Sequence, residues 1–235
     1  ELLLRKGKPA ISPLLHRLAE EGEISARRRL ISALIRFGEV AVPQVVEMLG
    51  DERWYVVRNM ATILAEIGGE KEVPALGEAL LHEDPRVRRE ALRALTRIKG
   101  QQAAGLILEA LKDPDEAIRR QAIISVGVLR EPRAITYLVG LIRRKGLGEA
   151  ELSTKKEAVL ALGMIGSDAS VPQLAEILAK EHWFNRRRHN ELRLSAVAAL
   201  RNIGSKRALE AVRQGLNARS KEVRGACQSA LAGVL

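Results

Sequence analysis

The sequence repeats itself at a nearly constant interval, and this repeat constrains the fold more than any other feature. In the segment VRREALRALTRIKG, apolar residues occur at steps 0, 4, 8 and 11 counted from Val87. On a helix that turns about 100° per residue, these positions form one narrow stripe. The same frame recurs from six other origins: Ala26, Val56, Ile118, Thr154, Leu192 and Val223.

A second apolar pattern, with steps 0, 3 and 7, follows these helices. In three copies Pro occupies the position after the origin, where a missing N–H costs nothing. The origins of this pattern are residues 11, 42, 73, 104, 135, 171 and 209, so the spacing is 31 four times, then 36 and 38. One such helix pair has too little apolar surface to fold alone. The sequence therefore predicts an all-α solenoid in which neighbouring pairs stack.

The ends of the predicted helices carry residues typical of helix caps. Asp84 and Asp113 are expected to be N-caps, each followed by Pro at the first helical position. Four first helices meet Gly at step 12, where a residue that tolerates the left-handed conformation is needed: Gly38, Gly68, Gly166 and Gly204.

The amino-acid composition supports a helical repeat protein and argues against a disulfide and a membrane span. Hydrophobic residues make up 46% of the chain but aromatic residues only 3%, which suits close helix packing. A single Cys227 excludes an intramolecular disulfide, and no apolar run of about 18 residues predicts a membrane span. We expect a cytoplasmic protein. Because the chain starts without Met in the middle of a repeat, we also expect an excised part of a longer protein.

Enzyme signatures are absent from the sequence. It contains no phosphate-binding loop, no G-x-S-x-G elbow and no H-E-x-x-H motif. Cys227 lies at an apolar step and is interpreted as a small core residue. His182 and His189 lack nearby Cys or acidic residues at ligand spacing. We therefore predict no enzymatic activity, no cofactor and no metal site.

The repeated segments resemble HEAT repeats, and in particular the short repeats of about 30 residues found in phycobilisome lyase-type proteins. The segments DPRVRREALRALTRIKG and SVPQLAEIL carry this resemblance, which covers essentially the whole chain. It implies a right-handed α-solenoid. Members of this family are mostly protein-interaction scaffolds, some assist cofactor attachment, and a distant HEAT-like group acts as alkylpurine DNA glycosylases. We predict one domain over residues 1–235, with about six repeats and partial ones at both ends: 1–22, 23–50, 51–82, 83–112, 113–145, 146–180, 181–217 and 218–235.

Step 1 of the first helices is usually basic, which places a ladder of cations beside the buried stripe. Two interpretations remain open. In the first, the ladder binds the phosphates of a nucleic acid. In the second, each cation pairs with a loop carbonyl or an acidic residue of the adjoining repeat. The acidic candidates are Asp51, Asp84, Asp113 and Asp115. We favour the structural interpretation. The ladder residues are Arg27, Arg88, Arg119, Lys155, Arg193 and Arg224, with Arg58 one place late.

Two insertions interrupt the constant spacing. Five extra residues fall near RRKGLGEAELS, and seven extra residues form the block from about His182 to Asn190. The second block is either a longer helix end in which Trp183 and Phe184 fold back over a widened gap, or a binding epitope, because aromatic residues and Arg are enriched in binding hot spots. Trp54 is likewise either a packing residue or a binding residue, and we expect it to pack against the preceding repeat. The candidate partner-binding residues are Trp183, Phe184, Arg186, Arg187, Arg188 and Trp54.

These features predict a scaffold that binds a protein partner through an extended solenoid surface. The net charge of +10 keeps a second possibility open, a module that binds DNA, RNA or another polyanion. A third alternative, which the lyase-like resemblance allows, is an accessory subunit of a cofactor-attachment system.

Overall fold

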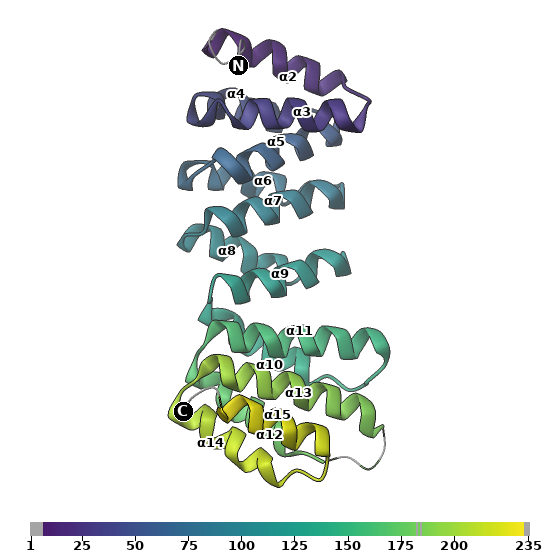
Figure 1. The fold of residues 1–235 in the computed structure, drawn as a ribbon. Coiled ribbons are helices and arrows are strands. Elements are labelled where there is room, and N and C mark those ends of the chain that lie inside the picture. The colour runs from purple at the N-terminus through teal and green to yellow at the C-terminus, as the bar shows by residue number, and fades with distance from the viewer. Residues whose placement is uncertain (1–6, 182, 184, 233–235) are drawn as a thin grey trace. The chain divides into compact units, whose positions relative to one another are not determined.

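The computed structural model describes residues 7–181, 183 and 185–232, and every regular element in these ranges is a helix (Figure 1). The chain forms two compact units, Glu1–Gln121 and Ala122–Leu235, and helix α9 (Glu116–Val128) crosses the boundary. The prediction of one domain with the repeat boundaries given above stays a prediction. Among the described helices, none is long and apolar enough to cross a membrane.

The first unit is built from helix pairs in two layers (Figure 1). Its longer helices, α3, α5 and α7, pack against one another in chain order, and the shorter α6 packs against α7 and α8. Short 3-10 turns lead directly into three of the second helices, α2, α4 and α6. The helices are α2 (Ile11–Glu20), α3 (Ile24–Ile35), α4 (Val42–Glu47), α5 (Trp54–Ile67), α6 (Val73–Ala79), α7 (Pro85–Ile98) and α8 (Gln101–Ala110).

The second unit repeats the same arrangement with two longer helices. Helix α11 packs along α13, which in turn packs against α12, α14 and α15. The helices are α10 (Ile135–Arg143), α11 (Glu149–Ile165), α12 (Val171–Ala179), α13 (Arg186–Ile203), α14 (Lys206–Gln214) and α15 (Lys221–Ala232).

Most of the predicted apolar stripe is buried, and in α7 the buried face is wider than predicted. Helix α3 is an exception, because Leu34 is its one buried residue. In α7, Val87, Ala91 and Leu95 are fully buried, as the frame requires. Leu92 and Ala94, at steps 5 and 7, are also fully buried. A first helix contacts the first helices on either side as well as second helices, so it needs more than one narrow apolar stripe.

The predicted caps are confirmed in part. Asp84 caps α7 by accepting a hydrogen bond from the backbone N–H of Arg86, and Pro85 is the first helical residue. The prediction for Asp113 and Pro114 is wrong, because α9 begins only at Glu116. Its first amides, those of Ala117 and Ile118, donate instead to the Asp115 carboxylate.

Three of the four step-12 glycines adopt the left-handed conformation, with φ of 60° at Gly38, 75° at Gly166 and 66° at Gly204. Gly68 does not, since its φ is −78°. An added Cβ there would lie 2.6 Å from the carbonyl oxygen of Leu64, so lack of space explains this glycine.

Both insertions lengthen the helix that follows them, so residues 186–190 of the second block belong to a helix. Helix α13 begins at Arg186, well before Leu192, and α11 begins at Glu149 rather than near Thr154. Polar residues of good helix propensity continue each helix backwards from its buried part. His182 and Phe184 lie outside the described residues.

Candidate interaction surface

The six ladder cations bind backbone carbonyl groups in the last turn of the preceding second helix or in the connection after it. These carbonyls lie at or just beyond the end of the preceding second helix, where a helix leaves acceptors unpaired. Each cation thereby links two successive helix pairs. The acceptors are Gly22 for Arg27, His82 and Glu83 for Arg88, Asp113 and Pro114 for Arg119, Arg144 and Gly146 for Lys155, Leu178 for Arg193, and Ala218 and Arg219 for Arg224.

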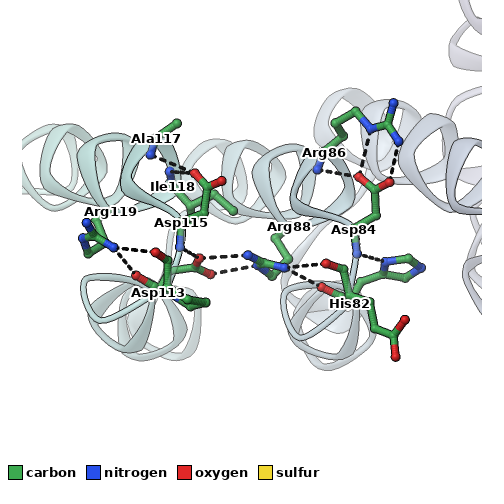
Figure 2. A network of polar contacts seen from close by, with 11 residues as sticks. His82, Asp84, Arg86, Arg88, Asp113, Asp115, Ala117, Ile118 and Arg119 are labelled. Atoms are coloured by element: carbon green, nitrogen blue, oxygen red, sulfur yellow. Dashed lines mark hydrogen bonds and ion pairs between the residues drawn. The ribbon is translucent and has the colours of Figure 1, made fainter.

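Arg88 makes the most complete set of contacts in the ladder (Figure 2). Its Nε and Nη2 donate to the two carboxylate oxygens of Asp113 at 2.9 and 3.0 Å, and its Nη1 donates to His82 and Glu83 at 2.9 Å each. The side chains of Arg88 and Asp113 are only 12% and 8% exposed. Arg88 therefore joins the connection before α7 to the connection that follows α8.

The other acidic candidates do not pair with the ladder. Asp51 and Asp84 each bind the Arg two residues later through its backbone N–H and its guanidinium group, and Glu131 binds Arg133 in the same way. We call this arrangement the acid-x-Arg clamp. The bond from Arg86 lowers the pKa of Asp84 to about 2. Sequence reasoning missed the clamp, although an acid two residues before Arg recurs in the connections.

Trp54 is half-buried, and the described contacts of its ring lie on its own helix and on the following repeat. The guanidinium carbon of Arg86 lies 3.4 Å from the ring centre and that of Arg58 lies 5.4 Å away, while Tyr55 meets the ring edge-on at 5.8 Å. Arg86 is itself fixed by Asp84. The ring thus links α5 to the following repeat through its cation–π contact with Arg86. The expected packing of Trp54 against the preceding repeat stays a prediction.

Trp183 differs from Trp54 in that its side chain is exposed. The residue is 85% exposed, so this indole does not act as a filler over a gap. Arg186 and Arg187 follow in the first turn of α13 and are exposed as well, and Arg187 pairs with Glu191 at 3.7 Å while remaining 94% exposed. We call Trp183, Arg186 and Arg187 the insertion edge.

The base of the insertion edge is fixed by contacts to neighbouring segments. The Glu181 carboxylate accepts a hydrogen bond from the backbone N–H of Arg219 at 2.7 Å and also lies 3.5 Å from Arg193. Arg188 donates to the carbonyl oxygen of Leu147 at 2.8 Å, so the two insertions meet. Sequence reasoning missed both contacts, because their partners lie 38 and 41 residues apart.

A hollow of about 430 Å³ lies beside the insertion edge. Its lining includes Trp183, Arg186 and the exposed Arg219, whose guanidinium group pairs with Glu181 at 3.3 Å. The hollow brings an exposed ring together with four cations and with the carboxylates of Glu181 and Glu222. Such an arrangement can accept an apolar side chain next to a carboxylate.

Family models match most of the chain. Residues 11–84 and 73–149 match the model for HEAT repeats, and residues 155–180 and 192–218 match the model for PBS lyase HEAT-like repeats. The first of these covers more than half of the sequence. The chain belongs to the HEAT-repeat family.

Several solved structures are similar to this chain, and one of them has a TM-score above 0.5. An engineered protein is 20% identical with a TM-score of 0.52, over 82% of this chain and 96% of that one. The complex of CpcE and CpcF of phycocyanin lyase from Nostoc is 22% identical with a TM-score of 0.42, over 98% of this chain and 84% of that one. Human deoxyhypusine hydroxylase in complex with glycerol is 19% identical with a TM-score of 0.45, over 96% of both chains. No curated protein sequence matches this one.

The ionisable groups of these HEAT repeats show few features of a reactive site. Cys227 is buried, and burial raises the pKa of its thiol, which favours the unreactive protonated form. Burial lowers the pKa of Lys155. The described part of the chain contains no cluster of three or more His, Cys, Asp or Glu side chains suited to a metal ion. The pairing of His182 with His189 involves a residue outside that part.

The two tryptophans should differ in their access to a quencher. We expect the Trp183→Phe variant to lose most of the acrylamide quenching of fluorescence, because Trp183 is 85% exposed. The Trp54→Phe variant should be quenched more strongly than the unmodified chain. Equal quenching of the two variants would contradict the exposure of the insertion edge.

Proposed function

We propose that this HEAT-repeat chain is a non-enzymatic scaffold that binds a protein partner through the insertion edge of its second unit. The observation that carries the proposal is the 85% exposure of Trp183 beside the exposed Arg186 and Arg187. Trp and Arg are enriched among the few residues that carry most of the binding energy in protein interfaces.

The anchoring of the edge supports the same proposal. Glu181, Arg193 and Arg219 form a linked set of contacts below the edge, and Asn190 donates to the Ser220 hydroxyl at 3.1 Å. A surface held in place in this way loses little conformational entropy on binding.

The charges at the edge indicate the chemistry of the partner surface. Arg186, Arg187 and Arg219 are exposed, and the chain carries a net charge of +10. An acidic segment with a large apolar residue complements this surface and is attracted over a distance by the positive field.

Contacts of the ladder argue against the polyanion alternative. Ladder cations are bound to backbone carbonyls, and Arg193 is 5% exposed, so they form no free stripe for phosphates. A polyanion complex would instead rely on scattered surface cations. Its affinity would fall steeply with salt, and a mobility shift with duplex and single-stranded DNA over a range of salt concentrations measures this.

A capture experiment with two matched variants tests the proposal. The edge variant carries Trp183→Ser, Arg186→Ser and Arg187→Ser. The control variant carries Leu81→Ser, Arg89→Ser and Arg93→Ser, which removes an 84% exposed apolar residue and two exposed arginines from the first unit. We expect the immobilised chain and the control to retain the same partner from a lysate of the source organism, and the edge variant to retain at least about tenfold less.

Equal retention by the edge variant would contradict the proposal. The identity of a captured partner also separates the alternatives, since an accessory subunit of a cofactor-attachment system should retain an enzyme or its carrier protein. Retention that depends on nucleic acid, and that nuclease treatment removes, would favour the polyanion alternative.

A further inference from the structure

The second unit contains a cavity of about 460 Å³ below its two insertions. This volume lies in the usual range for small-ligand sites. The cavity lies among the C-terminal ends of α10 and α12 and the first halves of α11 and α13. Ile142, Ile177 and Leu192 form apolar parts of its lining.

Two buried cations border the cavity from opposite repeats. Lys155 is 6% exposed and Arg193 is 5% exposed, and both line it. The Arg193 Nε is bound to the carbonyl oxygen of Leu178. The Lys155 Nζ donates to the carbonyl oxygens of Arg144 and Gly146, and an ammonium group has three N–H donors. The third donor therefore has no partner among the described residues.

Lys155 is the one Lys among the six ladder cations, and the other five are Arg. An ammonium is a compact charge with rotatable donors, whereas a guanidinium fork extends further and fixes its donors in a plane. Lys therefore places a shorter and more compact cation below the lengthened connection. Burial of the ammonium lowers the pKa of Lys155, and the negative charge of Glu151 opposes this shift only in part.

The rim of the cavity adds further positive charge. Arg144, Lys145 and Lys180 line the cavity and are exposed. Glu176 is the carboxylate among the described lining residues, and one of its oxygens accepts a hydrogen bond from the Gln173 amide at 3.3 Å. Lys and Arg residues of the lining therefore outnumber this carboxylate by six to one.

We propose that this cavity binds an organic anion, with its charged head near Lys155 and the rim cations and its apolar body against Ile142, Ile177 and Leu192. A neutral apolar ligand would leave the buried ammonium without its third acceptor. An inorganic anion would leave the apolar lining uncovered. The inference does not rest on the proposed partner surface, because the insertion edge contributes no residue to this lining.

Anilinonaphthalene sulfonate is a suitable probe, since it combines an anionic head with an apolar body and becomes fluorescent when it leaves water. We expect saturable binding at one site of the full chain. Phenyl-naphthylamine, a neutral dye of similar size, should bind at least about tenfold more weakly.

Charge reversal at the rim tests the location of the site. The Lys145→Glu, Lys180→Glu variant should bind the anionic dye at least about tenfold more weakly. The matched control is Lys206→Glu with Arg207→Glu, which makes the same change in net charge at two exposed residues of α14 that do not line the cavity. It should bind within about twofold of the unmodified chain. Equal weakening in the two variants, or non-saturable binding, would overturn the inference.

Two further variants refine the test. Glu176→Gln removes the lining carboxylate and should tighten dye binding, while Lys155→Met should abolish saturable binding. If Lys155→Met fails to fold, the rim variants still decide the outcome.

Competition with the bound dye then identifies the source of the anion. Displacement by octanoate alone indicates a free small molecule, displacement by an acetylated Leu-Glu-Glu peptide alone indicates a peptide segment, and displacement by neither overturns the inference.

Discussion

Replacement of Arg88 by Ala is expected to lower the free energy of unfolding by about 3–5 kcal/mol. The change leaves the Asp113 carboxylate, which is 8% exposed, without its bidentate partner, and removes the donor to the carbonyls of His82 and Glu83. Such a loss is a large share of the stability of an ordinary domain, which is about 5–15 kcal/mol. Urea denaturation of the full chain, followed by circular dichroism, measures it.

Matched variants isolate the contribution of the buried pair. Arg93→Ala removes a side chain that is 61% exposed and pairs with Glu90 on the helix surface, and it should cost less than about 1 kcal/mol. The double variant Arg88→Ala, Asp113→Ala should cost clearly less than the sum of the single variants, because each single change leaves the other group buried without a partner. If the losses in unfolding free energy were additive, or equal for the Arg88 and Arg93 variants, the ladder cations would not stabilise the connections between helix pairs.

Replacement of Gly163 by Val is expected to destabilise the second unit by at least about 2–3 kcal/mol. Gly163 is buried in α11, and a Cβ atom there would lie 2.6 Å from the Cα atom and 2.8 Å from the Cβ atom of Ala199 in α13. The two helix backbones would have to move apart along their contact. Thermal unfolding of the full chain is the measurement.

Gly140 supplies the control for this prediction. It is an exposed residue of α10, and an added Cβ would meet nothing within 4 Å. Gly140→Ala should stabilise the chain by about 0.5–1 kcal/mol through helix propensity alone. If Gly163→Val were as stable as the unmodified chain, the close approach of α11 and α13 would not hold in solution.

Helix positions and the buried stripe could be read from the sequence because they depend on local periodicity. The frame from Val87 correctly placed α7 and its core residues Ala91 and Leu95. It missed Leu92 and Ala94, since their burial arises from contacts with other helices and not from the stripe. The early start of α13 was missed for a similar reason. Its first residues are polar and exposed, so no apolar step marks them.

Contacts between residues that are far apart in the sequence could not be predicted from it. The basic character of step 1 indicated the ladder, but nothing local pairs Arg86 with Trp54 or Arg188 with Leu147. The unusual composition of the second insertion did point to Trp183. Only the structure distinguishes its 85% exposure from the half-buried state of Trp54.

These features separate cations that hold the repeats together from an exposed edge that is available to a partner. The most direct test is partner capture by the Trp183→Ser, Arg186→Ser, Arg187→Ser variant, with the unfolding temperature recorded on the same sample. We predict loss of capture with an unfolding temperature within about 2 °C of the unmodified chain, as expected for exposed residues. Retained capture, or a fall of more than about 5 °C, would contradict this and assign the edge a structural role.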